Sequence, residues 1–452
     1  MKKYSWLASA LLTCFCCSCF SSRAQLAISA QIRPRAEFRN GQGAPLPKDV
    51  QPAIFISQRT RLNLSYAMPR LKLGLSLQDV RVWGQDVSTI NATTTQNNNG
   101  LMLHEAWAEI LLSDTATKTY SFSVKIGRQE LIYDDQRLLG NLDWLQQARR
   151  HDAAVLKFEN KVYVLHLGAA FNQNQQNASG TIYNPLPPGN YPASTNSGTM
   201  YKSMEFLYAQ RKLTKGTISF LYFADQFSKY HPDSSGNLKI YQTGAWSRNT
   251  TGFYFNNSFG NLQATASAYY QFGKNANGQN INAILLSGSL QYQLTKQFFA
   301  GGGIDYTSGG ANASKTNSFD PLYGTPHKFW GLMDYFYAAS PFGNGGLSDY
   351  YIKTKLKPSE NFWLTADLHQ FSSAAKVTVP SDPANTKKSF GQEMDIVGSY
   401  NLTKQISFEA GYSHFFCTSL LTSPSVKNIP NAKNGADWAY LMINIRPEFL
   451  FK

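Results

Sequence analysis

Alternation of apolar and polar residues is the feature that most limits how this chain can fold. In residues 283–294, Ile, Leu and Tyr take most of the even positions, while Ser and Gln take most of the odd ones. A period of two marks β-strands with one apolar and one polar face. About 18 segments show it, each of roughly 9–14 residues, long enough for a tilted strand to cross a bilayer. The segments are residues 26–39, 54–68, 70–83, 102–113, 119–128, 150–159, 162–172, 200–213, 216–227, 241–256, 261–273, 281–294, 297–308, 347–357, 362–371, 389–402, 405–416 and 436–447.

The connections between these segments alternate in length. Short ones such as Met68-Pro69 and Thr403-Lys404 alternate with long ones rich in Asn, Gly, Ser, Pro and Thr. Short turns at one end and long loops at the other are typical of outer-membrane barrels. We therefore predict an all-β fold for residues 25–452, a transmembrane antiparallel β-barrel of about 18 strands with short periplasmic turns and long extracellular loops. A soluble all-β protein, such as a propeller or a β-helix, is the alternative, but the blade repeat of a propeller is not visible. The long connections are centred near residues 90, 140, 185, 235, 330, 380 and 425.

Residues 1–24 have the features of a secretory signal peptide. Two lysines precede an apolar stretch from Trp6 to Phe20, and Ser22-Arg23-Ala24 provides a small-residue cleavage site. A transmembrane anchor is the first alternative, but the apolar stretch is shorter than the roughly 20 residues of a spanning helix. A lipoprotein signal at Cys14 is a second alternative, but it would leave a very short apolar core. Cleavage after residue 24 would leave Cys417 as the one cysteine, so we expect no internal disulfide.

The predicted mature chain is basic. Loss of residues 1–24 removes three basic residues and no acidic ones, which changes the balance from 42 basic and 28 acidic residues to 39 and 28, a net charge of +11. Such an excess indicates an anionic partner. Nucleic acid is not expected, because the chain is exported and has no recognisable nucleic-acid module.

Basic residues gather on the polar faces of the first two predicted strands, and these faces line the lumen of a membrane barrel. Guanidinium groups hold carboxylates and sulfates well, so a wall of arginines suggests a path for an anionic solute. Structural pairing with lumenal Asp and Glu is the alternative. Both interpretations remain open for any single arginine, and the group as a whole favours the path. The basic residues expected in the lumen are Arg33, Arg35, Arg59, Arg61, Lys353 and Lys355.

No catalytic, metal-binding or cofactor-binding constellation is recognisable. The seven histidines are scattered, and no nucleophile elbow or metal-spaced cluster accompanies them. We therefore predict that the protein is not an enzyme and carries no cofactor.

Several segments resemble the alginate export family of outer-membrane barrels, in the form found in Bacteroidetes. The matching segments are QIRPRAEFRNG, ISQRTRLNLSY, QDVRVWGQ, GRQELIYDDQRLLGNLDW, QQARRHDA, FDPLYGTPHKFWGLMDYF, GQEMDIVGSY and WAYLMINIRP. The resemblance implies an 18-stranded, monomeric barrel whose electropositive lumen conducts an acidic polysaccharide. It does not imply that the polymer is alginate.

The resemblance also bears on the charged stretch between the fifth and sixth predicted strands. We expect this stretch to fold over or into the pore, with Arg128, Arg137 and Arg150 on the path and Asp134 and Asp135 at the constriction. A loop with internal salt bridges that only stiffens the rim is the alternative.

The leading hypothesis is an outer-membrane channel for an anionic polysaccharide or oligosaccharide, with lipid and periplasmic export machinery as further partners. One alternative is an uptake porin for small organic anions. Another is a surface adhesin with a barrel anchor, in which aromatic residues of the long loop 309–346 stack on a sugar. A loop packed as a plug would bury those aromatic residues instead. They are Tyr323, His327, Phe329 and Trp330.

Overall fold

The computed structural model describes residues 25–84, 101–116, 119–172, 201–236, 238–338, 340–384 and 387–451. The proposed signal peptide and the loop centres predicted near residues 90 and 185 lie outside these ranges. The signal peptide therefore stays a prediction.

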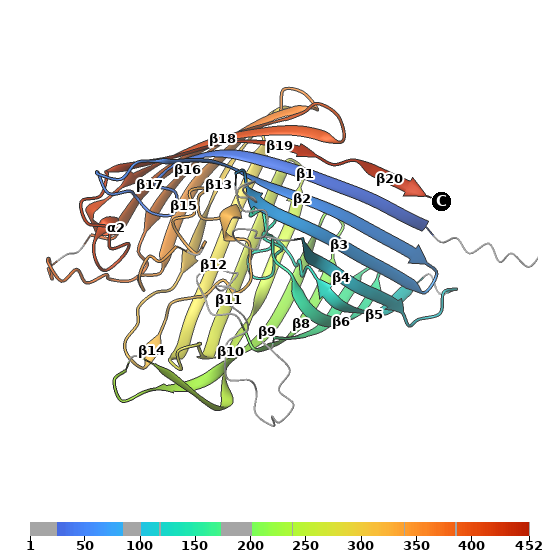
Figure 1. Ribbon diagram of the computed structural model, residues 1–452, viewed down its shortest axis with the longest axis horizontal. Helices are drawn as coiled ribbons and strands as arrows, with labels where there is room; N and C mark the ends of the chain where they lie inside the picture. The colour runs from blue at the N-terminus through green and yellow to red at the C-terminus, as the bar shows by residue number, and fades with distance from the viewer. Residues whose placement is uncertain are drawn as a thin grey trace, which may run out of the picture.

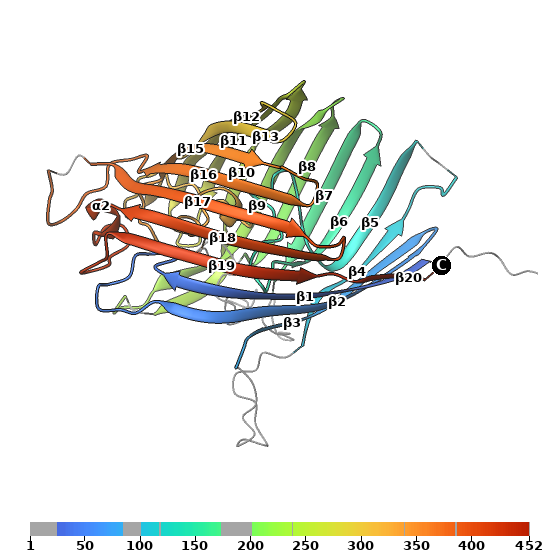
Figure 2. The same cartoon turned by 90° about the horizontal axis from the view of Figure 1, so that it is seen from above.

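The described chain forms a closed antiparallel β-barrel of 18 strands (Figures 1 and 2). Each strand pairs with its neighbour along the chain, and β1 pairs with both β2 and β19, which closes the cylinder. The predicted fold class is confirmed, and each of the 18 predicted segments has a matching strand. The strands are β1 (Gln25–Asn40), β2 (Ala53–Met68), β3 (Leu71–Val82), β4 (Met102–Leu111), β5 (Tyr120–Gln129), β6 (His151–Asn160), β7 (Tyr163–Phe171), β8 (Ser203–Lys212), β9 (Gly216–Pro232), β10 (Lys239–Phe259), β11 (Leu262–Lys274), β12 (Asn280–Gln293), β13 (Phe298–Thr307), β15 (Leu347–Leu356), β16 (Phe362–Ser372), β17 (Ser389–Asn401), β18 (Ile406–Cys417) and β19 (Gly435–Ile445).

Four short elements complete the fold. β20 (Glu448–Phe451) follows β19 after a break at Pro447 and pairs with the start of β1. The break is expected because proline has no amide hydrogen for the ladder. Within the described ranges, none of the helices has the length and apolar character that crossing a bilayer requires. The other elements are β14 (Lys315–Thr316), η1 (Pro326–Lys328) and α2 (Ser419–Thr422).

Two connections at the loop end are shorter than the sequence suggested. β9 and β10 have 17 and 21 residues, so the long loop predicted near residue 235 is mostly a strand hairpin. Its polar composition resembled a loop, but Tyr230 packs on Tyr241 and Trp246 across the hairpin, with ring centroids 6.0 and 5.1 Å apart. Cross-strand aromatic pairs of this kind stabilise paired strands. The β11–β12 connection, residues 275–279, is also tight, so the predicted alternation of loop lengths fails at these two places.

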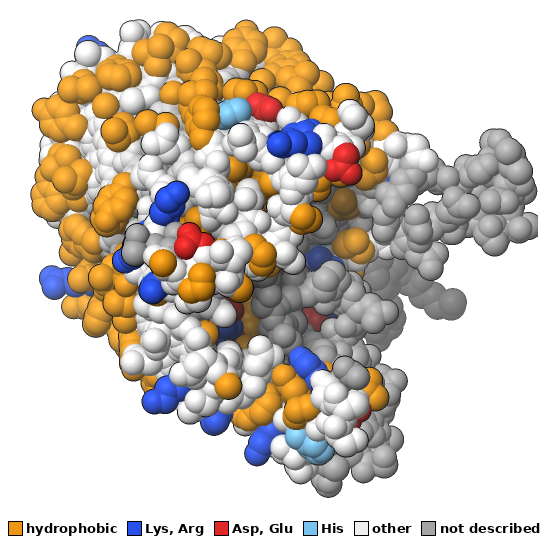
Figure 3. All heavy atoms as spheres, turned by 90° about the vertical axis from the view of Figure 1, so that its left-hand side faces the viewer, with side chains coloured by type: hydrophobic (Ala, Val, Ile, Leu, Met, Phe, Trp, Pro, Cys, Tyr) orange, Lys and Arg blue, Asp and Glu red, His pale blue; other side chains and the backbone are white. Residues whose placement is uncertain are grey.

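The two faces of the wall have opposite chemistry. Large apolar side chains such as Leu290, Ile352 and Leu441 are more than half exposed on the outside, while Gln31 and Gln78 are buried inside. An outward apolar band is what contact with lipid requires. Figure 3 looks onto the loop end, where hydrophobic side chains gather along the outer edge and charged side chains lie over the loops.

Two segments from the loop end fold into the barrel, namely the β5–β6 segment (residues 130–150) and the β13–β15 segment (residues 308–346). They join in a short parallel bridge, in which the Tyr323 amide donates to the Leu138 carbonyl oxygen at 2.9 Å and the Gly140 amide donates to the Tyr323 carbonyl oxygen at 3.0 Å. We call these two inward segments together the plug. Tyr323 and Trp330 are each 1% exposed, so these two rings pack inside the plug and are not available for stacking at the surface.

The inward fold of the β13–β15 segment is testable by cysteine labelling in a Cys417→Ala background. Ser381→Cys, in the exposed β16–β17 loop, should react with a membrane-impermeant maleimide added to whole cells. Thr325→Cys should be protected, because Thr325 is 7% exposed within the plug. Ser359→Cys, in a short turn, should react only after the outer membrane is permeabilised. Labelling of Ser359→Cys in intact cells would show that the short turns face the outside of the cell, opposite to the predicted orientation.

Candidate functional site

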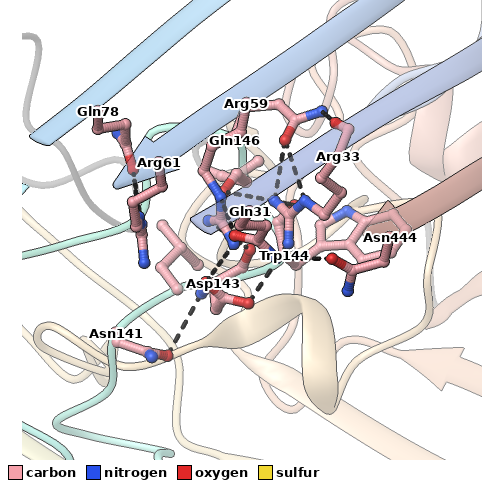
Figure 4. A network of polar contacts seen from close by, with 12 residues as sticks. Gln31, Arg33, Arg59, Arg61, Gln78, Asn141, Asp143, Trp144, Gln146 and Asn444 are labelled. Atoms are coloured by element: carbon pink, nitrogen blue, oxygen red, sulfur yellow. Dashed lines mark hydrogen bonds and ion pairs between the residues drawn. The ribbon is translucent and has the colours of Figure 1, made fainter. Parts of the chain in front are cut away.

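Four of the five arginines of the first two strands, namely Arg33, Arg35, Arg59 and Arg61, lie on the inner face of the barrel, and Figure 4 shows Arg33, Arg59 and Arg61 side by side. Arg33 and Arg59 are direct partners in the β1–β2 register, and only 3% and 1% of their surfaces are exposed. Like charges placed opposite each other on a sheet destabilise it. A counter-charge is therefore needed at this point of the wall.

Asp143 of the β5–β6 segment supplies that charge. Its Oδ2 lies 3.3 Å from Arg33 Nη1, and its Oδ1 lies 2.8 Å from Arg59 Nη2. Burial alone would raise the pKa of Asp143, but the charges of Arg59 and Arg33 outweigh it and hold this pKa below its usual value. One carboxylate thus bridges two arginines that come from adjacent strands.

Further contacts clamp the segment on the same wall. Arg35 Nη1 donates to the Trp144 carbonyl oxygen at 2.9 Å, and its guanidinium lies 4.3 Å from the centroid of the Trp144 ring. His327 of the β13–β15 segment stacks on Trp144 at 4.4 Å, while Arg33 Nε donates to Gln146 Oε1 at 3.1 Å. Trp144 therefore joins the barrel wall to both inward segments.

Arg61 is the least enclosed of the four. It donates to Gln78 Oε1 at 2.6 and 3.0 Å and lies 3.9 Å from Glu130 Oε1. It also lines a cavity of about 300 Å³ together with Asn141 and Arg446.

The sequence allowed two roles for these arginines, a path for an anionic solute and structural pairing with carboxylates. Arg33 and Arg59 are paired with Asp143, and Arg35 is paired with Glu37 at 2.9 Å. For these three, structural pairing describes the contacts. Arg61 has a more distant carboxylate and faces a cavity.

Arg137 anchors the β5–β6 segment to a different part of the wall. Its Nη1 lies 2.7 Å from Asp305 Oδ2 on β13, and its Nε lies 3.3 Å from Asp135 Oδ2. The side chain is 5% exposed and packs against Phe329, with its guanidinium 4.0 Å from the ring centroid. Together with the Asp143 contacts, this pair ties the segment to the barrel on two sides.

Arg128 does not lie on the lumenal path predicted from the sequence. It belongs to β5, on the same outward face as Ile126, and pairs with Asp152 of β6 at 2.8 Å. Arg128 lies within the predicted segment 119–128 and has the same phase as Phe122 and Ile126, so strand alternation points it outward, whereas the family resemblance placed it on the path. Arg150 is partly exposed and immediately precedes β6.

Asp134 and Asp135 lie in the β5–β6 segment, as predicted, but face different neighbours. Asp135 pairs with Arg137, whereas Asp134 accepts hydrogen bonds from the hydroxyls of Tyr208 at 2.8 Å and Ser219 at 2.7 Å. Burial raises the pKa of Asp134 to about 6, and the two hydroxyls oppose this rise only in part.

A larger cavity of about 680 Å³ lies between the plug and the wall formed by β1 and β15–β19. Aromatic and basic side chains share its surface. The charged residues that line it include Lys328, Lys353, Lys355, Asp367, Glu409 and Arg446. Asn141, Asp143 and Arg446 also line the cavity beside Arg61, so the two cavities adjoin.

The cations of this larger cavity differ in how they are balanced. Lys353 lies 3.2 Å from Asp367 Oδ2, whereas Lys355 contacts the face of Trp363, with Nζ 5.4 Å from the ring centroid. Among the described residues, neither Lys355 nor Arg446 has a carboxylate oxygen within 4.0 Å. Lys355 was predicted from the polar face of its strand. Arg446 was not named, although it lies in the predicted segment 436–447 on the same polar face as Tyr440 and Asn444, so its alternation was a usable signal.

Metal binding has no visible basis in the part of the chain that the structure describes, where no group of three or more His, Cys, Asp or Glu side chains is arranged to hold an ion.

Comparisons with known proteins agree with this architecture. The sequence model of the family described as alginate export matches residues 24–422. Three crystal structures from Pseudomonas aeruginosa have similar folds. OccK11 (OpdR) has a TM-score of 0.55 at 12% identity, with 94% of this chain and 96% of that chain covered. The outer membrane protein opdK has a TM-score of 0.58 at 10% identity, with 94% and 99% covered. OpdK with vanillate has a TM-score of 0.57 at 9% identity, with 94% and 99% covered. The comparison with curated protein sequences returned no match.

Removal of the bridging carboxylate should loosen the β5–β6 segment. In Asp143→Asn, Arg33 and Arg59 would face each other without a counter-charge. We expect a cost of about 2 kcal/mol, below the range for a fully buried pair, because the Asp143 side chain is 41% exposed. Single-channel recordings should then show higher and noisier conductance. Asp152→Asn, which breaks the outward pair with Arg128, is the matched control and should conduct like the native protein. Identical recordings from both variants would show that Asp143 does not hold the segment.

Docking of the same segment should depend on pH through Asp134. Its pKa is raised from 3.8 to about 6, so the docked segment binds a proton between these pH values that the released segment does not. A fall in pH from 7 to 5 should therefore stabilise docking by roughly 1 kcal/mol, because the pKa of about 6 lies in the middle of this range. Hydrogen exchange of residues 130–150 should slow at pH 5 after correction for the intrinsic rate. Asp134→Asn should abolish this change, and a pH response that persists in the variant would assign it to another group.

Proposed function

Because the chain belongs to the alginate export family, we propose that this outer-membrane, porin-like barrel is a passive channel for an anionic polysaccharide or oligosaccharide. The fold and the family match support a channel in place of an enzyme. The substrate class rests on the charges that face the cavities.

The observation that carries the proposal is that two cations of the barrel wall, Lys355 and Arg446, have no carboxylate oxygen within 4.0 Å among the described residues. Lys355 and Arg446 line the larger cavity, and Arg446 also lines the cavity beside Arg61. A cation that is already neutralised contributes little to the field in a pore, whereas one without a partner attracts a passing anion. A passage along these two residues would therefore favour anions.

The aromatic side chains of the same cavity support a saccharide as the anion. Trp363 and Tyr440 line it beside the two cations. Aromatic rings with an apolar face and a polar edge offer broad contact to a molecule that is apolar on one face and hydroxylated at its rim. Tyr440 also donates to Glu409 Oε1 at 2.9 Å, which holds its ring in place.

The arginine wall has a different role in this proposal. Since Arg33, Arg35 and Arg59 hold the β5–β6 segment, their replacement should first change how that segment is seated. A change in selectivity would follow from the altered constriction. Lys355 and Arg446 are therefore the sharper test of selectivity, because no described part of the plug depends on their charge for an ion pair.

Uptake of small organic anions is the second candidate. The two cavities have volumes of about 300 and 680 Å³, which suit small solutes while the inward segments are in place. One structure of similar fold, OpdK, was solved with vanillate. Channel block by oligosaccharides of increasing length separates the two candidates, because only a polysaccharide channel should bind longer chains more tightly.

The Lys355→Gln/Arg446→Gln variant should lose much of the preference of the channel for anions. A reversal potential across a planar bilayer in a salt gradient measures this preference, and we expect it to move toward zero. Block by an acidic oligosaccharide should weaken by about tenfold if both charges contact it.

The matched control is Lys48→Gln/Lys315→Gln, which removes two exposed lysines from the loop end. It should leave the reversal potential nearly unchanged. If the two variants behave alike, or if neither differs from the native channel, the path does not pass Lys355 and Arg446.

A further inference from the structure

One tripeptide recurs at the end of the barrel that carries the short turns. Leu-Thr-Lys occupies residues 213–215, 294–296 and 402–404, which form the β8–β9, β12–β13 and β17–β18 turns. The lumen and the plug do not use these residues. Their repetition on three separate turns therefore needs its own explanation.

In two of these turns a threonine cap holds the backbone so that the lysine projects from it. In the β12–β13 turn, Thr295 Oγ1 accepts from the amides of Gln297 and Phe298 at 3.2 and 3.0 Å. In the β17–β18 turn, Thr403 Oγ1 accepts from the next amides in the same way, at 3.1 and 3.0 Å. A threonine that caps two following amides fixes the turn. The lysine between them makes no part of this cap and is exposed.

Asn160 builds a fourth turn on the same plan. Its Oδ1 accepts from the amides of Val162 and Tyr163 at 2.8 and 2.6 Å, and the residue between the cap and these amides is again an exposed lysine, Lys161. Different side chains thus produce the same arrangement of a cap and a projecting cation.

Exposed cations occur on six of the eight short turns or directly beside them. Among the described residues, none of them has a carboxylate oxygen within 4.0 Å. Exposed acidic residues on the described parts of the short turns are Asp114 and Glu360. The cations, which we call the turn ring, are Arg70, Lys161, Arg211, Lys212, Lys215, Lys296, Lys357 and Lys404.

The turn ring lies directly beneath the apolar band. Leu294, Leu356 and Leu402 immediately precede their turns and are 56%, 40% and 52% exposed. Tyr163, next to the Lys161 turn, is 47% exposed. Each cation therefore stands where the lipid-facing surface ends, which is the level of the headgroups.

We propose that the turn ring binds the anionic phospholipid headgroups of the periplasmic leaflet. The distribution of the cations favours lipid over a soluble partner. The six turns belong to strand pairs from β2–β3 to β17–β18 and so surround the barrel (Figure 2). A docked protein would cover one arc of this circle, whereas a leaflet contacts all of it. This inference does not depend on the proposed cargo.

The test compares lipid preference in the full-length barrel. Native protein is reconstituted in vesicles of equal parts phosphatidylcholine and phosphatidylglycerol, and spin-labelled forms of each lipid report their association with the protein surface. We expect phosphatidylglycerol to be preferred about three- to fivefold at low salt, with less preference at high salt. The Lys161→Gln/Lys215→Gln/Lys296→Gln/Lys404→Gln variant should bring the ratio close to one, and arginine at all four positions should restore it.

A loop-end variant with the same loss of charge is the control, in which Lys48, Lys239, Lys315 and Lys376 are each changed to Gln. It should keep the preference for phosphatidylglycerol. Three outcomes would overturn the proposal. They are equal association of both lipids in the native protein, equal loss in the two variants, and an unchanged lipid preference in the turn variant together with weaker retention of an acidic oligosaccharide. The last outcome would make the ring a surface that collects cargo.

Discussion

The bilayer offers no hydrogen-bonding partner to the backbone, and this constraint shapes the whole molecule. A sheet that crosses it must close, which the pairing of β1 with β19 achieves. Closure also divides the side chains, because the outward face must be apolar and most charges must then point inward. The lumen consequently concentrates charges, and like charges such as Arg33 and Arg59 become direct neighbours.

The β5–β6 segment carries charged residues that form ion pairs with the charges of the wall. Asp143 balances two arginines on the β1–β2 wall, while Arg137 balances Asp305 on β13. The same residues that solve the electrostatic problem of the wall therefore hold the segment that narrows the pore. A buried ion pair of this kind gives little net stability against an apolar alternative, but breaking it from one side is costly. These ion pairs therefore fix the position of the β5–β6 segment and contribute little to the stability of the barrel.

The sequence predicted the barrel well, and the reason is local. Strand alternation is written in neighbouring residues, and lipid enforces it along each strand. The failures have other causes. Arg128 was placed on the path by the family resemblance, although its position in the strand has the same phase as the apolar residues Phe122 and Ile126. The pairing of Arg33 with Asp143 joins residues 110 positions apart, and no periodicity reports such a contact. Arg446 was overlooked although it lies in the predicted segment 436–447, in phase with Tyr440 and Asn444.

The ion pairs distinguish basic residues that hold the β5–β6 segment from basic residues that face the cavity, a distinction that the sequence alone does not make. Seen from the sequence, all lumenal arginines and lysines belong to one electropositive surface. In the structure, Arg33 and Arg59 share the one carboxylate of Asp143 and so keep a net charge of +1 between them, whereas Arg137 lies beside two carboxylates, those of Asp135 and Asp305. Lys355 and Arg446 line the cavity, and among the described residues neither has a carboxylate oxygen within 4.0 Å. In the proposed function, the seating of the β5–β6 segment and the preference for anions therefore depend on different residues, and substitution can alter one while the other is left in place.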